Sequence, residues 1–107
     1  MFWNKKKQEE PCVLPTKDEA NTMSHEQFKL ILHGCIQAMA KDIQSQIKKG
    51  FFAVEWDCMM YCGGAQEMHI QNVRRNEAIR LALCQYLEKN GYLVLWNESK
   101  QQLTVRW

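Results

Sequence analysis

The sequence predicts an α+β fold, a small three-stranded antiparallel sheet covered on one face by two helices. Two observations support this prediction. The chain after residue 90 has two runs rich in β-branched and aromatic residues around a polar Asn-Glu-Ser-Lys segment, as in a β-hairpin. Two segments before it repeat apolar residues at the three- and four-residue spacing of amphipathic helices. The predicted order is α-β-α-β-β, and the third strand is expected between the first and the second.

The predicted hairpin joins residues 91–96 to residues 103–107. Side chains alternate along a strand, so an even-numbered loop gives the hairpin one aromatic and aliphatic face: Tyr92, Val94, Trp96, Leu103, Val105 and Trp107. The other face carries Leu93 and Leu95 beside Thr104 and Arg106. Because an isolated hairpin is only marginally stable in water, we expect helices to cover the aromatic face.

The first helix is predicted to begin at Ser24, where Gln27 completes a capping box, and to end at Lys49 before Gly50. Its core-facing residues are expected to be Phe28, Leu32, Cys35, Met39, Ile43 and Ile47. Such a helix is roughly 38 Å long at 1.5 Å per residue. We therefore expect one of its ends to project from the body or to pack on a partner.

A strand is predicted over residues 51–57, with Phe52, Val54 and Trp56 on its apolar face. The second helix has two possible starts. Either it begins at Asn72 or Asn76, or it is a single long helix from Ala65, which we favour. Its core-facing residues are expected to be Ile79, Ala82, Leu83, Tyr86 and Leu87, with Leu81 and Cys84 on the opposite side.

Residues 1–23 show no helical or strand period, so the predicted organisation is an extended N-terminal arm (1–23) followed by a single α+β domain (24–107). The arm is either a simple leader or a segment whose apolar side chains fill pockets on a neighbouring chain. Those side chains are Phe2, Trp3, Val13 and Leu14.

Composition argues against several classes of protein. The formal net charge of +2 arises from 14 basic and 12 acidic residues, a balance that does not favour nucleic acid or an anionic membrane as partner. No apolar run reaches the ~18 residues of a membrane span, and the N-terminus lacks the apolar core of a secretory signal. Five cysteines, an odd number, favour a reducing compartment. The protein is therefore expected not to be secreted.

Three groups of residues could carry chemistry, and each also has a simpler interpretation. Cys58, Cys62 and His69 could bind zinc, but a fourth ligand is not evident, so a loop with free thiols is favoured. Glu55 and Asp57 share a strand face and are interpreted as solvated acids rather than an acid–base pair. A basic cluster for nucleic acid would need five residues to converge: Lys48, Lys49, Arg74, Arg75 and Arg80. The sequence accordingly predicts no catalytic residue, metal or cofactor, and a protein that is not an enzyme.

Apolar side chains that the predicted core does not use indicate a partner surface. Trp107 lies at the end of the sequence, and Phe51, Ala53, Leu93 and Leu95 make the second sheet face more apolar than a solvent face should be. The expected interface residues are Phe2, Trp3, Val13, Leu14, Leu81, Leu93, Leu95 and Trp107.

The last third of the chain, through Gly91-Tyr-Leu-Val-Leu-Trp96 and Leu103-Thr-Val-Arg-Trp107, resembles the ends of small uncharacterised proteins of tailed-phage genomes. The ending of the first helix, residues 43–50, is similar to theirs as well. The resemblance implies a compact α+β module of phage origin and carries no site residues.

The function expected from these observations is a non-enzymatic protein–protein interaction module, a phage-encoded homo-oligomer or subunit of a multi-protein assembly such as the virion. It would be located in the virion or the host cytoplasm. The alternatives are a host-directed inhibitor and a small nucleic-acid-binding protein.

Overall fold

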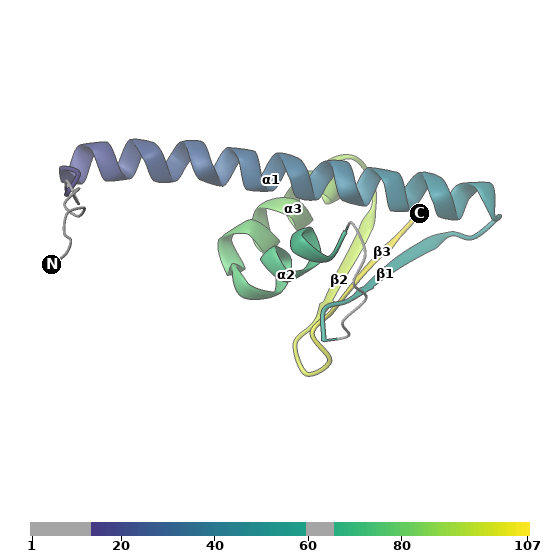
Figure 1. The fold of residues 1–107 in the computed structure, drawn as a ribbon. Coiled ribbons are helices and arrows are strands. Elements are labelled where there is room, and N and C mark those ends of the chain that lie inside the picture. Colours follow the sequence, from purple (N-terminus) through teal and green to yellow (C-terminus); the bar gives the residue numbers. More distant parts are fainter. Residues whose placement is uncertain (1–13, 60–65) are drawn as a thin grey trace, which may run out of the picture.

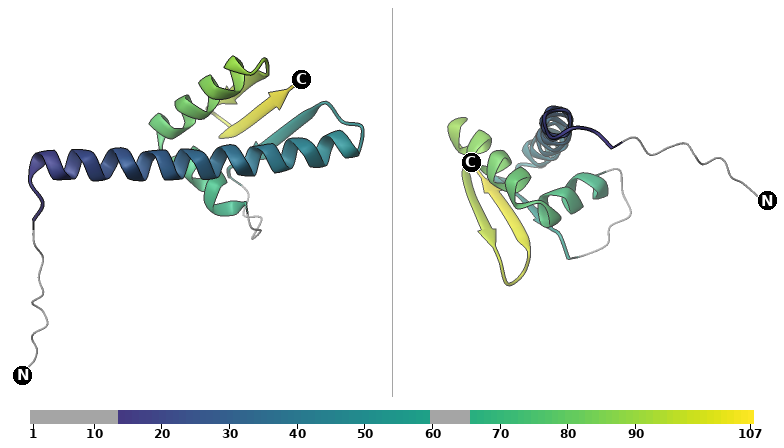
Figure 2. Two further views of the ribbon diagram at one scale, coloured as in Figure 1. Left: turned by 90° about the horizontal axis from the view of Figure 1, so that it is seen from above. Right: turned by 90° about the vertical axis from the view of Figure 1, so that its left-hand side faces the viewer.

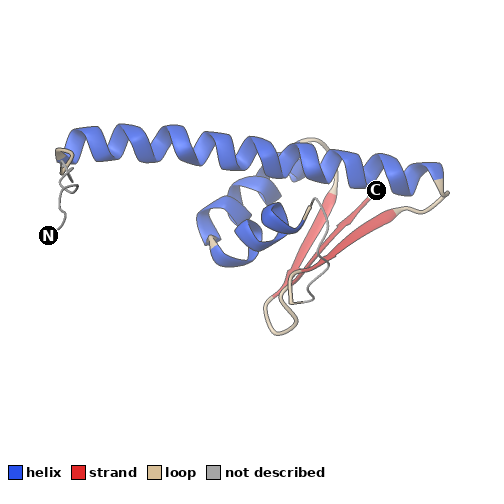
Figure 3. Ribbon diagram, in the orientation of Figure 1, coloured by secondary structure: helices blue, strands red, loops and turns tan. Residues whose placement is uncertain are grey.

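A computed structural model describes residues 14–59 and 66–107 of the chain (Figure 1). Within this part of the chain the fold is α+β, as predicted, in the order α-β-α-α-β-β. Its elements are α1 (Lys17–Lys48), β1 (Ala53–Asp57), α2 (Glu67–Arg75), α3 (Glu77–Lys89), β2 (Leu93–Asn97) and β3 (Gln102–Arg106). The described helices lie on one side of the sheet, and α2 packs against the other two (Figures 1 and 3).

The sheet has the predicted strand order β1-β3-β2, and both neighbouring pairs are antiparallel. The register places Val105 of β3 opposite Val54 on one side and opposite Val94 on the other. Leu103 is opposite Trp56 and Trp96 in the same way. The predicted hairpin and its two faces are therefore confirmed.

The core lies between the inner sheet face and the helices. Its buried side chains come from every described element and are Cys35, Ala38, Met39, Ile43, Val54, Trp56, Cys58, Ile70, Val73, Ile79, Leu83, Leu87, Val94, Leu103 and Val105. Fully burying one such aliphatic side chain contributes roughly 1.5–3 kcal/mol, so this cluster is the main source of stability.

The N-cap of the first helix lies eight residues earlier than the sequence predicted. Thr16, not Ser24, is its N-cap, and Thr16 exchanges capping-box hydrogen bonds of 2.9 and 3.1 Å with Glu19. Residues 17–23, assigned above to the extended arm, are therefore helical. The 32 residues of α1 span about 48 Å, and its first eleven are exposed on all sides. Figure 2 shows this part of the helix projecting beyond the body, as expected for one end of the helix.

We predict that a chain shortened to begin at Met23 keeps the thermal unfolding temperature of the full chain. The helical residues it loses are fully exposed, and Ser24 with Gln27 can cap the new helix end. Circular dichroism melting of both chains tests this expectation. A drop of several degrees in the shortened chain would show that the removed residues support the core.

The second predicted helix is two helices, so the favoured single helix from Ala65 is wrong. The chain leaves helical geometry at Asn76 (φ −119°, ψ 101°), which ends α2 and caps α3. The Asn76 Oδ1 accepts the backbone N–H of Ile79 at 3.2 Å. Arg80 donates from Nη1 to the carbonyl oxygens of Val73 and Arg74, at 3.0 and 3.2 Å. These hydrogen bonds satisfy backbone groups at the end of α2 and at the start of α3. Asn76 is one of the alternative helix starts that the sequence offered.

Three residues predicted to face the core are exposed instead: Tyr86 of α3, which is 46 % exposed, and the pair Phe52 and Ile47. Phe52 precedes β1, which begins only at Ala53, and 70 % of its side chain is accessible. Ile47 lies in the last turn of α1 and is also exposed. Phe52 and Ile47 flank Gly50, whose φ of +82° turns the chain from α1 into β1.

Candidate protein interface

The outer face of the sheet is not covered by any described element (Figure 3). Alternation and register place three rows of side chains on it: Ala53, Arg106 and Leu93; Glu55, Thr104 and Leu95; Asp57, Gln102 and Asn97. The β1 side is acidic, and Gln102 donates to Glu55 at 3.4 Å. The β2 side is apolar, with Leu93 and Leu95 57 % and 54 % exposed. These two leucines occupy the face that the sequence predicted for them.

A shallow hollow of about 540 Å³ lies at the other side of this face, where α1 turns into β1. Its lining residues are Gln46, Phe51, Phe52, Ala53, Glu55, Thr104 and Arg106. Phe51 is 57 % exposed, so both phenylalanines after Gly50 are accessible. The sequence predicted Phe51 on this outer face but assigned Phe52 to the core-facing side, so only half of the pair was anticipated.

The two edges of the sheet differ in which residues present backbone groups to solvent. The N–H of Cys58 donates to the carbonyl of Gln101 at 3.0 Å, and the N–H of Trp107 donates to the carbonyl of Phe52 at 3.1 Å. The backbone groups of odd-numbered β3 residues therefore point to β1, and those of even-numbered residues to β2. In an antiparallel pair, opposite residues exchange backbone N–H···O=C hydrogen bonds. Residues 93, 95 and 97 lie opposite even-numbered residues of β3, so their backbone groups bond to β3.

It follows that Val94 and Trp96 direct their backbone N–H and C=O groups away from the sheet. By the same reasoning, the backbone N–H and C=O groups that point away from the sheet at the β1 edge belong to Ala53, Glu55 and Asp57. The β1 edge therefore carries two acidic side chains, whereas residues 93–97 of β2 carry no charge. Natural sheets protect open edges with charges, so the described β2 edge is the unprotected one.

The inner side of the β2 edge is held by Arg80 of α3. Its guanidinium lies 4.4 Å from the centre of the Trp96 ring, close enough for a cation–π interaction. Trp96 in turn donates from Nε1 to the Glu98 carboxylate at 2.8 Å. That bond, with a second from Gln101, lowers the pKa of Glu98. Trp96 lies on the helix-covered side, as predicted, and is half-buried.

The structure does not gather the remaining predicted interface residues. Leu14 is 89 % exposed before α1, and Leu81 is 52 % exposed on α3. Trp107 is 37 % exposed and packs edge-on against Tyr92, with ring centres 6.1 Å apart. Phe2, Trp3 and Val13 lie outside the described residues. Leu93 and Leu95 are thus the predicted pair that lies side by side on one surface.

The candidate zinc ligands are only partly described, because Cys62 lies outside the described residues. Cys58 is buried, and desolvation raises the pKa of its thiol to about 11. The imidazole of His69 packs so closely on Gly34 of α1 that a Cβ there would lie 2.8 Å from its Cε1. Among residues 14–59 and 66–107, no three histidine, cysteine or acidic side chains are grouped to hold a metal ion.

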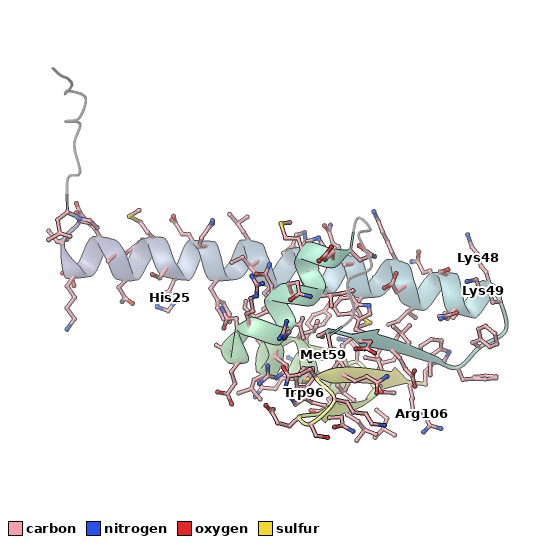
Figure 4. The ribbon with its side chains drawn as sticks, turned by 60° about the horizontal axis from the view of Figure 1, so that its bottom comes forward. His25, Lys48, Lys49, Met59, Trp96 and Arg106 are labelled. Carbon is pink, nitrogen blue, oxygen red and sulfur yellow. The ribbon has the colours of Figure 1, made fainter. Side chains whose placement is uncertain are left out.

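The basic residues considered for nucleic acid lie in two places. Figure 4 shows Lys48 and Lys49 at the C-terminal end of α1, opposite the end that bears His25. Arg74, Arg75 and Arg80 instead lie at the junction of α2 and α3, which Figures 1 and 2 place apart from that end. Of these, Arg80 is engaged by two carbonyl oxygens and Trp96.

The chain matches no known protein-family model, no curated protein and no solved structure. None of the helices in the described part has the length and apolarity needed to cross a membrane.

Proposed function

We propose that the protein is a non-enzymatic protein–protein interaction module that works as a subunit of a larger assembly. The observation that carries this proposal is the sheet covered by described helices on one face only, with Leu93 and Leu95 more than half exposed on the other. Apolar side chains gathered on an open sheet face, rather than scattered singly, are typical of a binding surface.

Two further features fit an assembly subunit. The exposed phenylalanine pair extends the apolar surface to the β1 side of the outer face. The projecting first eleven residues of α1 offer a second surface at the opposite end of the molecule, which is 62 Å long. Isolated helices of this length are marginal in water, so a neighbour that packs on this part would stabilise it. Phage origin and a place in the virion belong to the proposal through the resemblance of the last third alone.

The test is the mass of the native particle that contains the protein. We expect a chain purified from its natural source without denaturation to elute and scatter light as a complex well above 12.7 kDa. A double variant, Leu93→Ser with Leu95→Ser, should lower that mass, because it removes the apolar part of the outer face. A matched double variant, Gln85→Ser with Lys89→Ser on exposed positions of α3, should keep it. A native particle with the mass of one chain would contradict the proposal.

A further inference from the structure

We propose that the β2 edge pairs with the β2 edge of a second copy of this chain, joining two three-stranded sheets into one six-stranded antiparallel sheet. This inference rests on the proposed function and identifies the partner and the mode of contact. The partner strand is the same five residues, related by a twofold axis perpendicular to the sheet at Leu95.

The pairing follows from the backbone groups that β2 leaves unused. Val94 and Trp96 each present one N–H and one C=O to the edge, two donors and two acceptors per copy. If Val94 of one copy lies opposite Trp96 of the other, all of these groups are used in four hydrogen bonds. A shift by two residues in one direction pairs Trp96 with its own copy and Val94 with Glu98, whose carbonyl already accepts from the backbone N–H and the Nε2 of Gln101 at 3.4 and 2.7 Å. A shift in the other direction pairs Val94 with its own copy and Trp96 with Tyr92. That register fails because the N–H of Tyr92 already donates to the carbonyl of Leu87 at 3.1 Å.

The same register suits the side chains on both faces. On the outer face Leu95 lies opposite Leu95 of the second copy, in a pair without hydrogen bonds, where side chains approach most closely. On the inner face Val94 lies opposite Trp96, so two apolar side chains meet twice across the axis. Leu93 lies opposite Asn97 of the second copy, and no charged side chain of either strand enters the contact.

The β1 edge excludes the equivalent contact. Its outward groups belong to residues 53, 55 and 57, so antiparallel self-pairing that uses all of them would set Glu55 against Glu55. Like charges directly opposite one another destabilise a strand pair. A second copy is therefore favoured at the β2 edge and disfavoured at the β1 edge, which gives a closed dimer rather than an open fibre.

Disulfide trapping tests the register directly. In Leu95→Cys the two new thiols face one another across the axis, with Cβ atoms about 4.5–5.5 Å apart in such pairs, near the 3.5–4.5 Å that a disulfide needs. We expect mild oxidation with oxidised glutathione to convert this variant to a species of twice the 12.7 kDa mass that dithiothreitol reverses.

The matched control is Leu93→Cys, on the same strand, the same face and at nearly the same exposure. The proposed register places its two thiols four residues apart along the strands, about 14 Å, too far for a bond. This variant should give no more covalent dimer than the wild type, whose five native cysteines set the background. Equal trapping at positions 93 and 95, or none at 95, overturns the proposal.

A second pair of variants tests the same register without relying on disulfide formation. Leu95→Lys sets two ammonium groups against each other and should make the chain monomeric in light scattering, whereas Leu93→Lys faces Asn97 and should keep the dimer. A monomeric wild type, or a dimer that survives Leu95→Lys, overturns edge pairing. If either result is found while the native particle is much heavier than one chain, the proposed function still holds and the partner is a different protein. If the native particle has the mass of one chain, the proposed function itself is wrong.

Discussion

Replacing Trp56 with alanine should lower the free energy of unfolding by about 3–5 kcal/mol, the usual cost of truncating a large buried aromatic. Trp56 lies on the inner face of β1 and is 3 % exposed. Its Nε1 donates to Asp42 Oδ2 at 2.7 Å, and Gln66 donates to the other oxygen of the same carboxylate at 3.1 Å. The substitution therefore opens a cavity and also leaves Asp42 with one partner fewer.

Urea unfolding followed by circular dichroism measures this loss, and two variants separate its causes. Trp56→Phe keeps most of the ring volume but removes the donor to the half-buried Asp42 carboxylate, so it should cost about 1–3 kcal/mol. Phe52→Ala, on an exposed ring four residues away, should change stability by no more than about 0.5 kcal/mol. Equal losses at positions 52 and 56 would contradict the assignment of β1 to the core.

Local sequence was sufficient to predict most of the sheet. The hairpin and the placement of Leu93 and Leu95 on the outer face follow from alternation and loop length, which are properties of short segments. The strand order was inferred instead from the helical connection between the first two strands, with the third strand placed between them. The end of the first helix, like the hairpin, followed from a short segment, because a C-terminal glycine with positive φ, here Gly50, is a local signal.

The start of that helix could not be predicted, because the prediction relied on apolar residues spaced three or four positions apart. The first turns of α1 do not pack on the core, so they do not show this spacing. Thr16 and Glu19 form a capping box, and so in sequence do Ser24 and Gln27. The second box coincides with the start of the core-facing stripe, which made it the more convincing one. The residues between the boxes are exposed, so packing imposes no apolar spacing on them.

Only part of the candidate interface could be predicted from the sequence. Alternation identified the two leucines, but the direction of the backbone groups depends on which residues of β3 bond to β1. That parity is fixed by contacts between residues more than forty positions apart, such as Cys58 with Gln101. The role of Arg80 is also non-local, since the sequence analysis placed it among surface cations and the structure places it over Trp96.

Replacing Arg80 with alanine should lower the free energy of unfolding by about 2–4 kcal/mol, which makes it the largest effect expected of a charged residue here. Its guanidinium donates to the carbonyl oxygens of Val73 and Arg74, the last acceptors of α2, and lies 4.4 Å from the centre of the Trp96 ring. Hydrogen bonds from a charged donor are worth about 1.5–3 kcal/mol, and stacking at a part-exposed site adds about 0.5–1 kcal/mol.

Arg80→Lys should recover less than half of that loss, because an ammonium cannot present the planar fork that serves both carbonyl oxygens while stacking on a ring. Arg75→Ala, at an exposed neighbouring position, is the matched control and should stay within about 0.5 kcal/mol. Urea unfolding of the three variants, followed by circular dichroism, gives the comparison. If Arg80→Ala unfolds at the same urea concentration as Arg75→Ala, the guanidinium does not close the break between α2 and α3, and Asn76 alone maintains it.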